Sequence, residues 1–316
     1  MKIPGATIVQ LDKMPGENEI QKWGLTDYVG AVTDGTYGAV GFDFKSPHTG
    51  LAAKKAWFFF DKTYVCLGTN ISSRMKNQVL TTVNQCLLNG EVTVSDADGI
   101  HPQEQGSRMK KEVRWVVHDK VGYYFLKKEN VILSNQRIEG SWKIANRQTT
   151  TPTDIIRQDV FTLSVDHGRS PNNGDYAYMV IPSADPLSIE KQVEEEGVVI
   201  LANCPEVQAV RHDGLNMAYA AFYKGGTLRI HDKIVVEMDS PGMLMVKYND
   251  AGEILALGVS DPTRFMKKLH LSVNQKIVGA VQENIQTEWD EKQALTRITV
   301  ELPQNEYAGK SVIYNK

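Results

Sequence analysis

Residues that could do chemistry are sparse in this sequence, and the most suggestive ones lie in two loops. Asp34-Gly35, followed by Tyr37-Gly38, places a carboxylate and a phenol between two short apolar runs. Loops of this kind often line sites, although turn formation alone also explains Asp-Gly. In Asp166-His167-Gly168 a carboxylate and an imidazole could pair, or the residues could simply stabilise a turn.

Familiar catalytic and metal-binding signatures are missing from the sequence. It contains no GxSxG, P-loop, GxGxxG or HExxH motif, and its 7 histidines are scattered. The 3 cysteines, Cys66, Cys86 and Cys204, form no CxxC or Cys/His cluster, so a zinc site is not expected. We expect buried free thiols, with a Cys66–Cys86 disulfide as the alternative. We predict no cofactor, and no loop of the EF-hand type supports a structural calcium ion.

Tryptophans and paired lysines are the remaining candidates for ligand contacts. Trp23 and Trp289 have polar neighbours and could contact a sugar ring, whereas three other tryptophans lie in apolar runs and are expected in the core: Trp57, Trp115 and Trp142. The lysine pairs could attract an anionic polymer, but as isolated pairs they are typical of solvated strand ends: Lys54-Lys55, Lys110-Lys111 and Lys267-Lys268.

Composition narrows the class of protein. The 316 residues are 41% hydrophobic and 23% charged, which is ordinary for a globular protein long enough for two domains. A formal net charge of −3 argues against a broad nucleic-acid-binding surface. No apolar run reaches the ~20 residues of a membrane-spanning helix. We therefore expect neither nucleic acid nor membrane as a partner.

The element that must organise the chain is a hairpin within residues 51–73. The apolar runs Ala56–Phe60 and Thr63–Gly68 are separated only by Asp61-Lys62, which predicts two strands joined by a tight turn. Apolar side chains occupy both alternating faces of the first strand, so we expect it to be covered on both sides.

Further hairpins and loops follow from turn residues. Asn89-Gly90 predicts a hairpin between Val79–Leu88 and Glu91–Ser95. Residues Asp96–Lys110 are predicted as a polar loop, and Val131–Ile144 as two strands with Trp142 facing a core.

One helix is expected, over Ile189–Glu196, with Ser188 as its N-cap and Gly197 as its end. The acidic residues 194–196 are typical of a solvated face. Many short strands around one helix predict an all-β protein of two antiparallel sandwiches. We place the boundary between residues 198 and 199.

Several segments together resemble polysaccharide lyase family 8, the bacterial chondroitin, hyaluronate and xanthan lyases. The likeness runs in order along nearly the whole chain: Ile3–Thr7, Asp34–Asp43, Ala53–Phe60, Val65–Ile71, Gly122-Tyr123, Gly140–Trp142, Asp166–Gly168, Tyr176–Pro182, Ile200–Asn203 and Val259–Thr263. The resemblance implies a large β super-sandwich, residues 1–198, followed by a smaller C-terminal β-sandwich, residues 199–316. It also implies that a preceding α/α toroid of the family is not included in this chain.

The family's reaction removes the C5 proton of a uronic acid and expels the 4-linked oxygen. The resemblance places the Asn, His, Tyr and Arg for this chemistry on the toroid, so no residue of this chain takes those roles. Asp34 matches a family carboxylate that holds the catalytic arginine, and the family residue is a glutamate where this chain has the shorter aspartate. Asp34 is therefore the candidate supporting catalytic residue. Tyr37 and Trp23 are the candidate substrate-binding residues.

Two functions remain in view. In the first, the chain is the β part of a lyase acting on an acidic polysaccharide such as a glycosaminoglycan; it forms one wall of the substrate cleft and is inactive alone. In the second, it is a non-catalytic carbohydrate-binding or scaffold protein. The opening Met-Lys-Ile-Pro-Gly carries no signal peptide and suggests an excised fragment. By resemblance, the parent protein is expected to be secreted or periplasmic.

Overall fold

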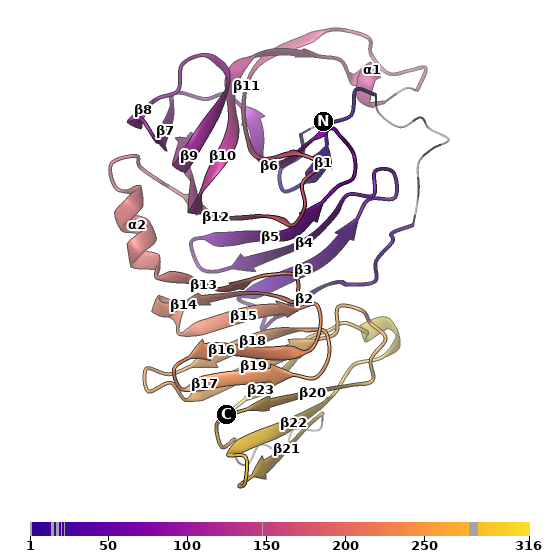
Figure 1. Ribbon diagram of the computed structural model, residues 1–316, viewed down its shortest axis with the longest axis vertical. Helices are drawn as coiled ribbons and strands as arrows, with labels where there is room; N and C mark the ends of the chain where they lie inside the picture. The colour runs from indigo at the N-terminus through magenta and orange to yellow at the C-terminus, as the bar shows by residue number, and fades with distance from the viewer. Residues whose placement is uncertain are drawn as a thin grey trace. The chain divides into compact units, whose positions relative to one another are not determined.

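The computed structural model describes residues 2–13, 16, 19, 21, 23–146, 148–277 and 284–316. The chain divides into two compact units. Unit 1 comprises residues 1–12, 75–171 and 178–187, and unit 2 comprises residues 13–74, 172–177 and 188–316. Both are built from antiparallel strands, which confirms the all-β prediction (Figure 1). The domain boundary between residues 198 and 199 stays a prediction.

Unit 1 is an antiparallel sheet organised around one strand of 20 residues, β10. Antiparallel neighbours run in the order β1-β6-β11-β10-β12, and β9 also pairs with β10 and carries the small β7–β8 hairpin. The core side chains include Trp115, Phe125 and Phe161, all fully buried. The elements are β1 (Thr7–Val9), β6 (Gln78–Leu87), β7 (Val92–Asp96), β8 (Gly99–Pro102), β9 (Gly106–His118), β10 (Val121–Gly140), α1 (Trp142–Ala145), β11 (Ile156–Arg169) and β12 (Gly174–Pro182), of which residues 174–177 belong to unit 2.

Unit 2 stacks three sheets. The first has the order β5-β4-β3-β2, the second β13-β14-β15-β18-β19-β23, and the third β16-β17-β20-β22-β21. The elements of the first two are β2 (Val29–Thr33), β3 (Gly38–Lys45), β4 (Ala52–Phe59), β5 (Tyr64–Ser72), β13 (Val198–Asn203), β14 (Val207–His212), β15 (Met217–Phe222), β18 (Gly242–Tyr248), β19 (Ile254–Ser260) and β23 (Val312–Asn315). Those of the third are β16 (Gly226–His231), β17 (Ile234–Met238), β20 (Lys268–Val273), β21 (Ile285–Asp290) and β22 (Leu295–Glu301).

The middle sheet of unit 2 is buried on both faces. All six residues of β15 are buried, because one face packs against the third sheet and the other against the first. Close packing requires small residues here: a Cβ on Gly41 of β3 would lie 2.8 Å from the Met243 sulfur and 3.1 Å from the Ala221 Cβ. A Cβ on Gly68 of β5 would lie 2.1 Å from the buried Tyr176 ring. These glycines allow layers to approach that larger side chains would separate.

The central hairpin is confirmed as β4 and β5, with Phe60 N–H donating to the Thr63 carbonyl across the turn. Its burial is asymmetric, which corrects the expectation of two covered faces. Phe58 is fully buried, whereas Phe59 on the opposite face is 41% exposed. A second expectation for this region was wrong. The pair Lys54-Lys55 was expected at a solvated strand end, but Lys55 is buried, with its ammonium 5.3 Å from the Trp57 ring.

Four expectations for residues 79–144 were wrong. Val131–Ile144 does not form two strands, because β10 continues to Gly140 and the helix α1 follows it. β6 and β7 flank Asn89-Gly90 but do not pair with each other; β6 pairs with β1 and β11, and β7 with β8 and β9. The stretch Asp96–Lys110 is not a plain loop, because it contains β8 and the start of β9. Trp142 begins the short helix α1 and is 62% exposed, so it does not face a core.

The main helix is confirmed as α2 (Ile189–Glu196), and it ends at Gly197 with a left-handed φ of 60°. Ser188 occupies the N-cap position but its side chain makes no capping hydrogen bond.

The three cysteines are free thiols; Cys66 is buried, and Cys86 and Cys204 are half-buried. In the described part of the chain no helix is long and apolar enough to cross a membrane.

Candidate functional site

Asp34 lies in the four-residue turn between β2 and β3, and the turn holds its carboxylate in a fixed position. Asp34 Oδ1 accepts hydrogen bonds from the backbone N–H groups of Thr36 (3.0 Å) and Tyr37 (2.9 Å). Gly35 adopts a φ of +93°, which few other residues tolerate. The Asp-Gly sequence therefore builds the turn, as a short side chain that bonds its own backbone does.

The other carboxylate oxygen is engaged by a residue from a distant strand. Lys247, in β18, places its Nζ 2.5 Å from Asp34 Oδ2 and 4.8 Å from the centre of the Tyr37 ring. The side chains of Asp34 and Lys247 are 16% and 30% exposed, so the ion pair is partly shielded from water. Partial burial raises the pKa of Asp34, but the hydrogen bonds from Lys247 and the two backbone groups outweigh it and leave the pKa below its ordinary value.

Two tyrosines complete the site. A hydrogen bond to Asp61, in the β4–β5 turn, raises the pKa of Tyr37. Tyr219, in β15, is 1% exposed, and its hydroxyl has no hydrogen-bond partner among the described residues. Burial raises the pKa of Tyr219, and the nearby Asp34 adds to the effect. The Asp34 site is thus a fixed ammonium–carboxylate pair with one partly open phenol and one buried phenol.

The site can bind and orient polar groups, but it is poorly suited to proton transfer by itself. A carboxylate with a lowered pKa is a weak base, and tyrosines with raised pKa values stay protonated at neutral pH. Asp34 and Tyr37 are brought together as the sequence suggested. Trp23 is not part of this arrangement: it is 83% exposed and, among the described residues, takes no part in the hydrogen bonds of the site.

A second polar group in unit 2 was missed by the sequence analysis. His212 Nε2 lies 3.1 Å from Glu196 Oε2, which also accepts from the Thr63 hydroxyl at 3.3 Å. The Phe60 ring lies 4.7 Å from the imidazole. Glu196 is therefore not simply on a solvated face, since its carboxylate ties the end of α2 to the β4–β5 turn and to β14. Nothing in the spacing of these residues along the chain could have indicated the contact.

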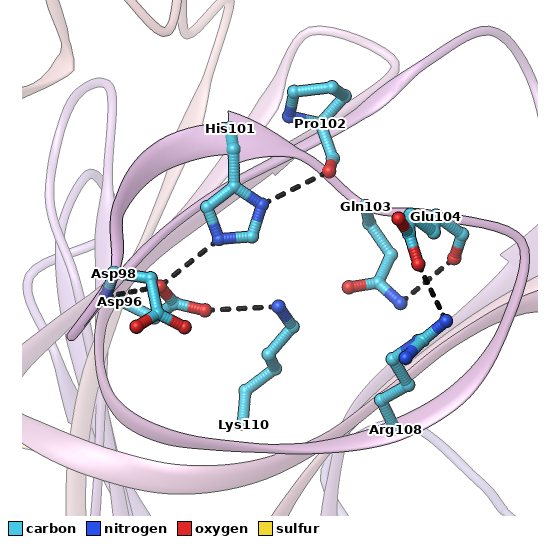
Figure 2. A network of polar contacts seen from close by, with 8 residues as sticks. All are labelled: Asp96, Asp98, His101, Pro102, Gln103, Glu104, Arg108 and Lys110. Atoms are coloured by element: carbon cyan, nitrogen blue, oxygen red, sulfur yellow. Dashed lines mark hydrogen bonds and ion pairs between the residues drawn. The ribbon is translucent and has the colours of Figure 1, made fainter.

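Figure 2 shows a polar network in unit 1, within the segment that the sequence indicated to be a loop. The Asp96 carboxylate is 3% exposed; it accepts from the backbone N–H of Asp98 at 2.9 Å and lies 3.1 Å from both His101 Nε2 and Lys110 Nζ. These contacts lower the pKa of Asp96 despite its burial. Because the contacts of Asp96 with His101 and Lys110 join β7 to β8 and to β9, the network stabilises the hairpin.

Asp166 and His167 point to different partners. Asp166 accepts from the backbone N–H of Gly168 (2.9 Å) and from Gln78 Nε2 (3.0 Å), whereas His167 Nε2 lies 2.8 Å from the Thr81 hydroxyl. Both arrangements fasten β11 to β6, which favours a structural role. Among the described residues, no group of three or more His, Cys, Asp or Glu side chains could hold a metal ion.

Comparison with known proteins identifies the family. Residues 1–193 match the model of the polysaccharide lyase family 8 super-sandwich domain, and residues 199–270 match that of the family's C-terminal β-sandwich domain. Chondroitinase-AC of Pedobacter heparinus is 34% identical over 98% of this chain and 41% of its own length. The hyaluronate lyase of Thermasporomyces composti is 28% identical over 90% of this chain and 36% of its own length.

Solved structures agree with the sequence comparison. The structure of chondroitinase AC lyase in oligosaccharide complexes matches with a TM-score of 0.84 and 34% identity, covering 99% of this chain and 43% of that one. The chain therefore spans about two-fifths of the length of these relatives. The two family models, matched in order, account for the super-sandwich and the sandwich that follows it. This chain belongs to polysaccharide lyase family 8.

Proposed function

We propose that this chain is the β portion of a polysaccharide lyase that cleaves uronic-acid-containing glycosaminoglycans, of the chondroitin or hyaluronan type, by β-elimination. The match to both β domains of the family, at 34% identity to a chondroitinase over almost the whole chain, carries the proposal. The chain forms one wall of the substrate cleft, and an α/α toroid supplies the Asn, His, Tyr and Arg that act on the C5 proton. The domain boundary lies between residues 198 and 199.

Asp34 supports the chemistry by holding the toroid's arginine. A carboxylate offers about four acceptor positions. Two backbone N–H groups use Oδ1 and Lys247 uses one position on Oδ2, which leaves one position on Oδ2 for a guanidinium. The arginine would then bind through one N–H rather than by a two-point fork, which is consistent with the short reach of an aspartate. Tyr37 faces the same site and is the candidate substrate contact.

The substrate class implies where the enzyme works. Glycosaminoglycans are extracellular polymers too large to diffuse into a cell. The parent protein is therefore secreted or periplasmic.

The test uses the ultraviolet absorbance of the unsaturated sugar that β-elimination produces. The chain alone is expected to give no product from chondroitin or hyaluronan, and the same chain joined to its upstream toroid is expected to give it. Product from the chain alone would refute the assignment of the chemistry to the toroid. Saccharide binding without product, even with the toroid joined, would favour the non-catalytic carbohydrate-binding alternative.

A variant in the joined enzyme tests Asp34 itself. Asp34→Asn keeps an acceptor oxygen for the turn but removes the charge, so turnover should fall about 10- to 100-fold, as for other residues that orient a catalytic group. Glu104→Gln is the control, because Glu104 is exposed in unit 1 and pairs only with Arg108 among the described residues. Turnover that is unchanged in Asp34→Asn removes Asp34 from the site.

A further inference from the structure

A groove of about 450 Å³ crosses the outer face of the third sheet of unit 2, where neither domain comparison nor catalytic argument assigns a role. Its floor is a cross-strand row in which one residue comes from each of four strands. Glu237 of β17 is opposite Ser272 of β20, Ser272 is opposite Arg297 of β22, and Arg297 is opposite Glu288 of β21. Side chains directly opposite one another stand about 5 Å apart, so the row forms one continuous polar strip.

A second row lies beside the first. His270 of β20 is opposite Thr299 of β22, and Thr299 is opposite Gln286 of β21. Asp239, just beyond β17, donates its backbone N–H to the His270 carbonyl and so extends the row toward the edge of the sheet. All four residues line the groove. The two parallel rows therefore place hydrogen-bonding side chains along the length of the groove and across its width.

Two of these side chains are held in place before any ligand arrives. Arg297 donates to Gln293 Oε1 at 2.8 Å and to Asp290 Oδ2 at 3.3 Å, which fixes the guanidinium over the sheet. His270 Nδ1 lies 3.1 Å from the Thr299 hydroxyl. Prior ordering of the binding groups lowers the entropy lost when a ligand binds.

The chemistry of the lining selects the class of ligand. Carboxylates, amides and hydroxyls predominate, and none of the described residues that line the groove is a Phe, Tyr or Trp. Protein–protein interfaces usually rely on aromatic or aliphatic anchors, so this lining fits a hydroxyl-rich molecule better than a protein surface. Three carboxylates line the groove: Glu237, Asp239 and Glu288. The guanidinium of Arg297 is already paired with Asp290, so the groove carries a net negative charge that repels a polyanion.

We propose that this groove binds a neutral oligosaccharide. Its volume lies in the range of small-ligand sites and is large enough for two or three sugar rings. Carboxylate and amide oxygens would accept from vicinal hydroxyls, while Arg297 and His270 would donate to ring and hydroxyl oxygens. The inference does not depend on the proposed lyase activity, because it rests on the groove alone.

The test is a calorimetric titration of the full chain with cellopentaose, mannopentaose and chitopentaose. At least one neutral probe should bind with a Kd on the order of 0.1–1 mM. Ser272→Tyr, which fills the middle of the groove from an outward-facing position, should weaken that binding at least ~10-fold. Lys268→Gln is the matched control: it lies on the same face of β20, pairs with Glu301 beyond the groove, and should leave binding unchanged.

Each other outcome overturns the proposal. No binding of any neutral probe shows that the groove is not a saccharide site. Binding that survives Ser272→Tyr places the site elsewhere on the chain. Tighter binding of a chondroitin tetrasaccharide that is lost in Ser272→Tyr refutes the charge argument, and binding of an oligolysine peptide alone assigns the groove to a basic partner. The lyase test is separate, since product formation by the toroid-joined enzyme is measured by ultraviolet absorbance and without the neutral oligosaccharides.

Discussion

The ion pair between Asp34 and Lys247 should contribute measurably to the stability of unit 2. The two charged atoms are 2.5 Å apart, and the side chains are 16% and 30% exposed. Exposed pairs contribute about 0.2–1 kcal/mol, and breaking a buried pair costs about 3–5 kcal/mol. This half-shielded pair should therefore show a coupling energy of about 1–2 kcal/mol.

The measurement is a double-mutant cycle with Asp34→Asn, Lys247→Met and the double variant, each followed by urea unfolding at pH 7. The single variants should each lower the free energy of unfolding, and the double variant should lower it by less than the sum. Lys224–Glu206 is the control pair in the same unit, because both of its side chains are largely exposed. Its coupling energy should stay below about 0.5 kcal/mol.

The same pair predicts a pH dependence with a definite sign. Because the pKa of Asp34 is lowered in the folded chain, its contribution is complete above the ~3.9 of an unfolded aspartate. The contribution is lost as the pH falls through the lower folded-state value. The coupling energy should thus be constant from pH 7 to about 5 and shrink toward pH 2. A coupling no larger than that of the control pair, or one that does not shrink in acid, would refute the reasoning.

Three other predictions concern packing and buried charge. Gly68→Ala should lower the free energy of unfolding by about 3 kcal/mol in urea denaturation, because its Cβ overlaps a buried ring, whereas Gly226→Ala, with open space around it, should change it by less than about 0.5 kcal/mol. Burial lowers the pKa of Lys55 to about 8 from 10.5, so the free energy of unfolding should rise with pH between these values. The variant Lys55→Met should show no such rise. A rise of equal size in this variant would contradict the reasoning. Asp96→Asn should speed hydrogen exchange in the β7–β8 hairpin and cost about 2 kcal/mol, while Glu104→Gln, in an exposed pair, should do neither.

Features governed by neighbours in sequence were predicted well. The β4–β5 hairpin and the helix α2 with its left-handed Gly197 follow from turn residues and local periodicity, and both are confirmed. The Asp34 turn also follows from its sequence, because Asp-Gly supplies both the side-chain acceptor and the positive φ. Local backbone conformation depends on a few consecutive residues, so the sequence contains the needed information.

Predictions were wrong where the pairing or burial of a segment depended on strands that are distant in the sequence. Asn89-Gly90 lies between β6 and β7, and Gly90 has a positive φ of 74°. The two strands nevertheless pair elsewhere, because the ladder positions beside β6 are taken by β1 and β11. Trp142 was assigned to a core by its hydrophobicity, yet the strand ends at Gly140 and the tryptophan is left exposed on α1. Pairing and burial depend on competition among all strands, which a short window cannot represent.

The sequence by itself determined the all-β class, the main turns, the helix and the family resemblance. Only the tertiary structure decided that Lys247, 213 residues along the chain, is the charge partner of Asp34, and that β15 rather than β4 is the strand buried on both faces. It also aligned Glu237, Ser272, Arg297 and Glu288 into one row of a groove. The physical reason is that strand register, set by the packing of whole sheets, chooses which distant side chains become neighbours.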